Sequence, residues 1–401
     1  MTECQNFDDP QYSILPSRLF QLNLPQIYRT FRGTPHAKTS LPLKSLSKTL
    51  IIRFSSIGDI VLSTPLLRVL REKFPKSQID YVTKSEYAEL VRSNQNINLT
   101  YEFDTAQGFP GLRKLKDRLK RERYDLVIDL HNSLRSRFLR SMRGVSDIVV
   151  VDKRVRERTL LVKLKKDTYA GLVPVADRYI ETLRDYGISR DGKGAELHIP
   201  DETLFGTASK IAKLRLNRFE RVLGLCPFAR HTTKEWPAKR YAEIGMKFIK
   251  ETDGAVMIFG GTPDVIRSSS VSAPIRATTH DERVVDFTGQ LSLTETAAAM
   301  QYCDVIVTND TGLMHIAAAM NRKLVAVFGS TVEQFGFYPP GNTSIILERK
   351  GLYCRPCSHI GRDECPEEHF RCMLETEVDE VWGVVKEMLG REDVPVDKER
   401  A

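Results

Sequence analysis

The sequence predicts an α/β protein with two open parallel sheets in series. From residue 48 onward, short apolar runs alternate with longer amphipathic segments, which is typical of strand–helix–strand units. After a charged helical stretch at about residues 175–216, the same alternation begins again. With 401 residues the chain is also too long for one ordinary core, because domains average roughly 150 residues.

The first set of elements opens with a buried strand at 49–54 and a helix at 63–74 that Pro75 ends. Strands are expected next at 78–83, 99–103, 125–130 and 147–151. The second set has strands at 221–228, 255–261, 284–289, 304–310 and 323–329. Its helices are expected at 237–251, with Pro237 at the first position, and at 291–303, with the capping-box pair Ser292 and Glu295.

This pattern divides the chain into four parts. Residues 1–47 form an extension that we expect to be poorly ordered, and residues 391–401 form a tail. Between them lie an N-terminal module, residues 48–200, and a C-terminal module, residues 201–390. In open α/β sheets ligands bind beyond the carboxyl ends of the strands, so the loops after each strand are the places to search for function.

Composition excludes several classes of protein. Hydrophobic residues make up 41% and charged residues 28%, which excludes a mostly disordered chain. No apolar run reaches the roughly 18 residues of a membrane span. The N-terminus does not resemble a secretory signal, and seven unevenly spaced cysteines are too few for a disulfide scaffold. These features predict a location in the reducing cytoplasm.

The net charge of +8 is unevenly distributed. Residues 111–170 hold 18 Lys and Arg against 8 Asp and Glu, whereas residues 351–401 hold 7 against 13. Charge alone would favour nucleic acid, but aromatic residues do not interleave the basic run and no recognition motif is present. We therefore expect no nucleic-acid partner.

Two strand-to-helix loops carry the strongest chemical signals. In the loop after the first strand, Ser56 and Gly58 precede Asp59, which either caps the helix or faces the crevice to accept a proton from a hydroxyl. At 307–320, Asp310, Thr311 and Gly312 stand at a helix start, where free N–H groups favour phosphate. His315 lies one turn in, on the face it shares with Thr311, so both could reach a diphosphate, the alternative being capping and packing.

Two further loops supply hydrogen-bond donors. At 226–241, Arg230, Thr232, Thr233 and Lys234 stand at another helix entrance and suit the same anion. At 130–140, Arg135, Arg137 and Arg140 follow a strand directly, either as a binding face or as a solvated helix face. Neither a Walker motif nor a dinucleotide-binding glycine fingerprint is present, so a P-loop enzyme and a typical NAD enzyme are not indicated.

Four motifs in these loops together resemble glycosyltransferase family 9, the ADP-heptose:lipopolysaccharide heptosyltransferases. They are SSIGDIVLSTPLL (55–67), DLHNSLRS (129–136), KEWPAKRY (234–241) and NDTGLMHIAAA (309–319), and the resemblance covers about residues 48–390. It implies a GT-B fold, in which two Rossmann-like domains face a central cleft, the N-terminal domain binds the acceptor and the C-terminal domain binds the nucleotide sugar.

The resemblance also implies roles for individual residues. Asp59 would be the general base of an inverting transfer that needs no metal ion, and Lys234 would hold the diphosphate and stabilise its leaving charge. The implied donor-binding residues are Thr232, Thr233, Lys234, Asp310, Thr311, Gly312 and His315. The implied acceptor-binding residues are Ser56, Gly58, Asn132 and Arg135.

The partners implied are ADP-heptose and an anionic glycolipid of the lipopolysaccharide inner core, with no cofactor. The basic stretch 154–166 favours peripheral contact with the cytoplasmic face of the inner membrane. Two alternatives stay open: the same fold acting on another nucleotide sugar or acceptor, and a binding protein without catalysis. Asp59 argues against the second, because a degenerate transferase would be expected to lose its base.

A cysteine-rich segment follows the last predicted strand. Cys354 and Cys357 form a CxxC pair, and Cys365 and Cys372 add two thiols, with His359 and His369 nearby in the sequence. This spacing allows a structural metal site away from the transfer chemistry. A cluster of reduced thiols is an equally good interpretation, because the spacing is irregular.

Overall fold

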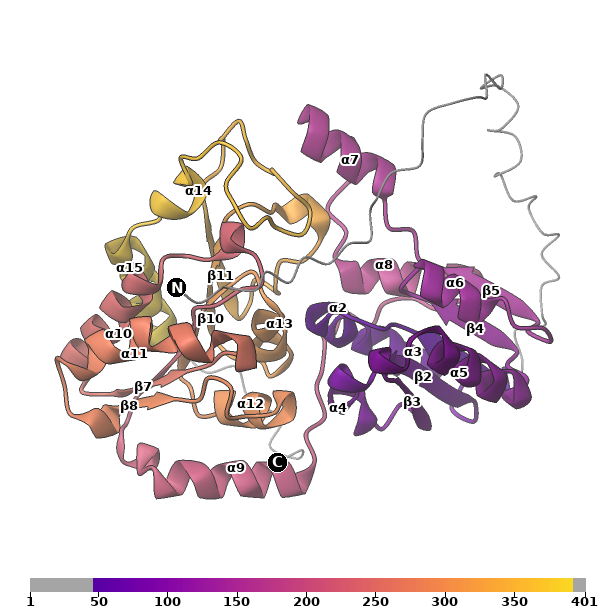
Figure 1. Cartoon of the computed structure of the whole chain (residues 1–401), viewed down its shortest axis with the longest axis horizontal. Helices are drawn as coiled ribbons and strands as arrows, with labels where there is room; N and C mark the ends of the chain where they lie inside the picture. Colours follow the sequence, from indigo (N-terminus) through magenta and orange to yellow (C-terminus); the bar gives the residue numbers. More distant parts are fainter. Residues whose placement is uncertain (1–45, 392–401) are drawn as a thin grey trace, which may run out of the picture. The chain divides into compact units, whose positions relative to one another are not determined.

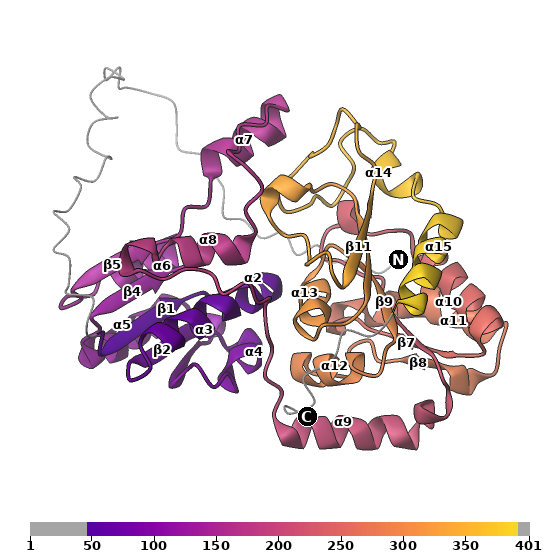
Figure 2. The same ribbon diagram turned by 180° about the vertical axis from the view of Figure 1, so that it is seen from behind.

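The structure is a computed structural model that describes residues 46–391 (Figure 1). The predicted extension and tail lie outside the described residues, apart from residues 46, 47 and 391. Of the helices in the described part of the chain, none combines the length and the hydrophobicity that crossing a membrane requires. Two parallel sheets form the framework, with helices on both faces of each sheet (Figures 1 and 2).

The N-terminal module contains a sheet in the order β3-β2-β1-β4-β5, and every pair in it is parallel. Its strands are β1 (Lys48–Ile52), β2 (Gln78–Lys84), β3 (Leu99–Phe103), β4 (Leu126–Asp129) and β5 (Asp147–Val150). The helices are α2 (Ile57–Val61), α3 (Thr64–Lys73), α4 (Glu89–Arg92), α5 (Gly108–Glu122), α6 (Leu134–Arg140), α7 (Val155–Leu164) and α8 (Val175–Glu181). All the strands predicted for this module are confirmed.

The C-terminal module contains a parallel sheet in the order β11-β10-β9-β6-β7-β8. Its strands are β6 (Val222–Cys226), β7 (Ala255–Ile258), β8 (Val284–Asp286), β9 (Val305–Asn309), β10 (Leu324–Phe328) and β11 (Ser344–Glu348). The helices are α9 (Asp201–Lys213), α10 (Ala238–Thr252), α11 (Val265–Arg276), α12 (Leu293–Met300), α13 (Gly312–Ala319), α14 (Arg371–Leu374) and α15 (Val378–Gly390). The α/β prediction of two parallel sheets in series is therefore confirmed.

Burial on both faces explains why apolar runs located the central strands. In β1, Ile51 packs in one apolar cluster while Leu50 and Ile52 pack in another, so helices cover both sides. In β9, Ile306 and Val307 are likewise divided between two clusters. The half-buried edge strand β11 has no such run of buried residues, and the apolar-run criterion did not detect it.

Capping residues set the helix starts. The predicted capping box of α12 is present: Ser292 Oγ accepts from the Glu295 N–H, and the Glu295 carboxylate accepts from the Ser292 N–H. Pro237 is the N-cap of α10 rather than its first residue, so the helix begins one residue later than predicted, at Ala238. A proline has no N–H to leave unsatisfied at either position, so the shift costs the helix nothing in hydrogen bonding.

Buried apolar side chains and a half-buried carboxylate join the two modules. One apolar cluster runs from Ile60 and Leu66 in the N-terminal module to Ile316 and Phe328 in the C-terminal module. Alongside it, the Glu89 carboxylate at the start of α4 accepts hydrogen bonds from the N–H groups of Leu293 and Thr294 and from the Thr294 hydroxyl. Glu89 therefore satisfies free N–H groups at the start of α12 from the other module.

Each sheet has a point where the strand order reverses direction. In the first sheet this point lies between β1 and β4, and in the second it lies between β6 and β9. Crevices for ligands form beyond the carboxyl ends of the strands at such points. The four loops that the sequence singled out are those that follow β1, β4, β6 and β9.

We predict that Ile51→Ala lowers the free energy of unfolding by about 3 kcal/mol, because it opens a cavity in the central strand of a fully packed sheet. Thermal or denaturant unfolding measures the change. Ile266→Ala is the matched control: Ile266 is 94% exposed on α11, and its loss should change the stability by less than about 0.5 kcal/mol. Equal effects of the two substitutions would contradict the assignment of the core.

Candidate active site

Asp59 lies in the first turn of α2, where four donors surround its carboxylate. Its Oδ2 atom pairs with Arg53 Nη2 at 2.5 Å and accepts from the Ser56 N–H at 3.2 Å and the Ser56 hydroxyl at 2.9 Å. Its Oδ1 atom accepts from the Tyr179 hydroxyl at 3.0 Å. Asp59 thus serves the helix start and belongs to a largely buried polar cluster, while its role as a base stays a prediction.

The surroundings of Asp59 keep it ionised. Burial alone would raise the pKa of its carboxyl, but the Arg53 charge and the hydrogen bonds from Ser56 and Tyr179 lower that pKa below its ordinary value. Sequence reasoning did not identify Arg53 or Tyr179. Arg53 stands at the end of a predicted strand, and Tyr179 lies in a helix far along the chain, so no local motif links either to Asp59.

The loop after β4 is organised by a buried carboxylate. Asp129 Oδ1 accepts from the N–H groups of His131 at 2.9 Å and Asn132 at 2.7 Å, and its Oδ2 accepts from Arg140 Nη1 at 2.8 Å. Burial, reinforced by the Arg53 charge, lowers the pKa of His131 to about 3, so its imidazole is neutral. His131 is a third residue that the sequence analysis did not identify, although it lies within the recognised motif at 129–136.

The structure separates two of the predicted acceptor residues from the Asp59 cluster. Asn132 has a positive φ of 42°, and its side chain accepts from Arg137 Nε at 3.4 Å. Arg135 is exposed in the first turn of α6 and forms no ion pair with any described residue. Its guanidinium is therefore free for an anionic partner, and its acceptor role stays a prediction.

An ion pair links the loop after β6 with the loop after β9. Lys234 Nζ lies 2.7 Å from Asp310 Oδ2, which also accepts from the Thr331 hydroxyl at 2.6 Å. Burial opposes ionisation of Asp310, but Lys234 outweighs it and lowers the pKa of this carboxyl. Because Lys234 and Thr331 occupy the Asp310 carboxylate, the geometry makes Asp310 the residue that orients Lys234.

The start of α13 packs directly against α2, as both views show (Figures 1 and 2). A Cβ on Gly58 would lie 2.4 Å from Cδ2 of His315, and a Cβ on Gly312 would lie 2.7 Å from Cβ of Ile57. Only glycine fits at these positions without a shift. The close approach that Gly58 allows is therefore to the His315 ring, and its predicted contact with an acceptor stays a prediction.

His315 lies in α13, and Thr311 is the N-cap of that helix. His315 is buried, its ring lies edge-on to Phe337, and burial lowers its pKa despite the nearby carboxylates of Asp310 and Asp59. The Thr311 hydroxyl is buried and has no hydrogen-bond partner among the described residues. An unpaired buried hydroxyl at a helix N-terminus is ready to receive a ligand oxygen.

The predicted threonine pair splits into two environments. The Thr233 hydroxyl donates to the Arg362 carbonyl at 3.0 Å and accepts from the Arg362 N–H at 2.7 Å, so the cysteine-rich segment occupies it. Thr232 is exposed. The Thr233 side chain therefore anchors the loop beside Lys234 to the cysteine-rich segment. The Thr232 side chain remains accessible to a ligand.

The four C-terminal cysteines lie close together in the folded chain. Cys354, Cys357, Cys365 and Cys372 line one small pocket, and Cys354 Sγ lies 3.8 Å from His369 Nε2. Within residues 46–391, however, no three His, Cys, Asp or Glu side chains are arranged to hold a metal ion together. Burial raises the thiol pKa of Cys354, Cys357 and Cys372. The structural metal site and the cluster of reduced thiols both stay predictions.

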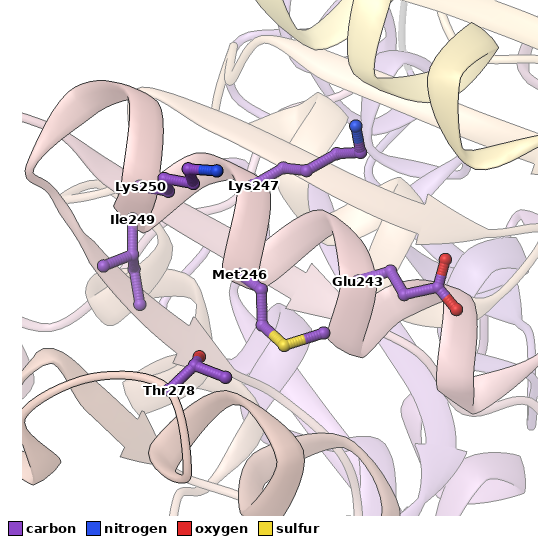
Figure 3. A pocket seen from close by; sticks show the side chains of 6 residues that line it. All are labelled: Glu243, Met246, Lys247, Ile249, Lys250 and Thr278. Carbon is purple, nitrogen blue, oxygen red and sulfur yellow. The ribbon is translucent and has the colours of Figure 1, made fainter.

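None of these residues lines a separate pocket along α10. It measures about 450 Å³ and is lined by Glu243, Met246, Lys247, Ile249, Lys250 and Thr278. Figure 3 shows these side chains along α10, with Thr278 beside them. None of them was predicted as a site residue, and no buried charged pair lies among them.

Comparison with known proteins identifies the family. The model of glycosyltransferase family 9 (heptosyltransferase) matches residues 112–368, well over half of the chain. Lipooligosaccharide heptosyltransferase 2 of Haemophilus influenzae is 30% identical over 71% of this chain and 84% of its own length. Lipopolysaccharide heptosyltransferase 2 of Escherichia coli is 28% identical over 72% of this chain and 84% of its own length.

A solved structure shows the same architecture. The family 9 glycosyl transferase of Veillonella parvula superposes with a TM-score of 0.70 at 22% identity, covering 86% of this chain and 97% of that one. The two parallel sheets and the match to the family model lead to the same conclusion. The chain therefore belongs to glycosyltransferase family 9, the heptosyltransferases, and is a glycosyltransferase with a GT-B fold.

Proposed function

We propose that this glycosyltransferase moves heptose from ADP-heptose to an anionic inner-core acceptor of lipopolysaccharide, with inversion and without a metal ion. One observation carries the proposal: the α2–α13 contact sets the Asp59 carboxylate beside the helix start that carries Asp310, Thr311 and Gly312. A base on one module thus faces an anion-binding turn on the other. The relatives named as heptosyltransferases support the choice of sugar and acceptor.

Groups on the proposed donor side can stabilise the negative charge of the leaving group. When the bond between the anomeric carbon and the phosphate oxygen breaks, negative charge grows on ADP. Lys234 supplies a positive charge that Asp310 holds in place, and the N-terminus of α13 adds free N–H groups and the Thr311 hydroxyl. These groups can stabilise a diphosphate without a divalent cation, which is the basis for proposing metal independence.

The acceptor side supplies the base. In the proposed step, Asp59 takes the proton of the acceptor hydroxyl as that oxygen bonds to the anomeric carbon, while ADP leaves from the opposite face. A single displacement of this kind inverts the configuration at that carbon. The lowered pKa of Asp59 keeps the carboxylate unprotonated at neutral pH, so it is available for each turnover.

Unpaired cations around the N-terminal module suit an anionic acceptor. Arg135 is exposed without an ion pair to the described residues, and Lys153 and Arg158 are partly buried cations whose pKa values burial lowers. Exposed Arg156 and Lys163 on α7 extend this positive surface, and we propose that it meets the anionic face of the inner membrane.

A donor screen tests the proposed function. We predict that turnover with ADP-heptose and a heptose-deficient lipid acceptor exceeds turnover with other ADP-sugars or with UDP-sugars at least about tenfold, and that excess EDTA leaves it unchanged. Product release measured by chromatography, with the anomeric configuration read by NMR, gives the result. Preference for another sugar would overturn the proposed donor, and loss of activity in EDTA would overturn metal independence. Retention of configuration would overturn the inverting mechanism.

Asp59→Asn tests the base. We expect turnover to fall about 10³-fold, because the amide cannot accept the proton, while ADP binding measured by calorimetry stays unchanged. Asp117→Asn, on the exposed face of α5, is the matched control and should keep full activity. Circular dichroism and thermal unfolding show that each variant is folded. An active Asp59→Asn enzyme would eliminate this assignment.

Lys234→Met tests the donor site. Loss of the charge should weaken ADP binding about 30-fold, which corresponds to about 2 kcal/mol for one charge-assisted contact. Lys247→Met is the control, because Lys247 also pairs with an aspartate, Asp379, at 2.9 Å, but on the surface of α10. Calorimetry at one fixed ionic strength compares them, and equal ADP affinity of the two variants would refute the role of Lys234.

A further inference from the structure

We propose that Tyr179 is the positioning residue for Asp59, and that α8, which carries it, ties the orientation of the base to the donor-side module. The inference rests on the proposed role of Asp59 as base. Tyr179 lies outside all four sequence motifs.

The hydroxyl of Tyr179 reaches the one carboxylate oxygen that the other donors leave open. Arg53 and both donors of Ser56 bind Oδ2 of Asp59, whereas the Tyr179 hydroxyl binds Oδ1 at 3.0 Å. Together they fix both oxygens and therefore the rotation of the carboxylate plane. Without Tyr179, the Oδ1 atom has no donor among the described residues.

The ring of Tyr179 is held firmly. Its side chain is 3% exposed, and the Arg53 guanidinium lies 5.7 Å from the centre of the ring. Tyr179 therefore packs against the same arginine that pairs with Asp59. A buried tyrosine whose hydroxyl donates to a carboxylate is restricted to one orientation, so it can transmit its position to Asp59.

The helix that carries Tyr179 is anchored on the C-terminal module. The Val175 N–H donates to the Gly336 carbonyl at 2.9 Å, and Arg178 Nη2 donates to the Gln334 carbonyl at 2.9 Å. Gly336 has a φ of 82°, and a Cβ there would lie 2.6 Å from the Val173 carbonyl oxygen, so the chain passes very close to the start of α8. The position of Tyr179 thus depends on the module that holds the donor turn.

The titration of Asp59 reflects all the ionisable groups that face it. They come from the middle of β2, from the segments that follow β1, β4 and β5, and from α8 and α13: Arg53, Tyr81, His131, Lys153, Tyr179 and His315. Arg53 is the nearest cation and remains when Tyr179 is altered. Removing the Tyr179 hydroxyl removes a donor to the charged form of Asp59, so the pKa of Asp59 must rise.

Tyr179→Phe tests the proposal in the full-length enzyme. We expect kcat to fall about tenfold and the acidic limb of the pH profile of kcat/KM to move up by about one pH unit, with ADP affinity unchanged. Tyr186→Phe is the matched control, because the Tyr186 hydroxyl also donates to a carboxylate, Asp147, at 2.6 Å, but in a contact to β5. It should leave kcat and the pH profile unchanged.

The outcomes separate this inference from the function beneath it. If Asp59→Asn is inactive but Tyr179→Phe keeps the wild-type acidic limb, Asp59 remains the base and the positioning role of Tyr179 is refuted. If Asp59→Asn stays active, Asp59 is not the base, and the positioning role of Tyr179, which rests on that assignment, is overturned with it. A fall in kcat of Tyr179→Phe with an unshifted limb and weakened ADP binding indicates general loss of structure, and it also overturns the proposal.

Discussion

The close packing of α2 against α13 is the constraint on which the rest of the site depends. Two glycines, Gly58 and Gly312, allow it, and a methyl group at either position would collide with the opposite helix. The helix α2 follows the central strand β1, and α13 follows the central strand β9. Their contact therefore brings together the carboxyl ends of the two sheets. Under the proposed function each module binds one substrate, and this contact brings the two substrates to one reaction centre.

Two buried ion pairs follow from that constraint. Arg53 with Asp59 and Lys234 with Asp310 each place a lysine or arginine against an aspartate at the end of a sheet. Buried pairs of this kind add little net stability, since desolvation offsets much of their attraction. Their effect here is to keep the Asp59 carboxylate ionised and to hold the Lys234 ammonium in one orientation.

Much of the fold could be predicted from the sequence, because β1, β6, β9 and β10 are buried on both faces and therefore consist of apolar runs. The edge strand β11 has no such run of buried residues. For the site, motif spacing located Asp59, Lys234 and the α13 turn, since each lies in one loop. Tyr179 and Arg362 contact the site across long sequence separations, and only the folded chain reveals them.

Chemical identity was harder to predict than position. The CxxC segment allowed a metal site, and its four cysteines do line one pocket, but no three ligands within the described residues are placed to hold an ion together. Gly58 predicted a close approach, and the approach in the structure is to the His315 ring, while the contact of Gly58 with an acceptor stays a prediction. The residue type of Gly58 was informative, but its partner lies on an element that local sequence does not name.

The most direct test of the shared reaction centre is the kinetics of Gly58→Ala, with ADP affinity measured on the same sample. The added methyl group would force the ring of His315 and the start of α2 apart. A displacement of about 1 Å at a reacting centre can cost about 100-fold in rate, so turnover should fall by that order while ADP binding changes less than about threefold. Full turnover by the folded variant would contradict the account.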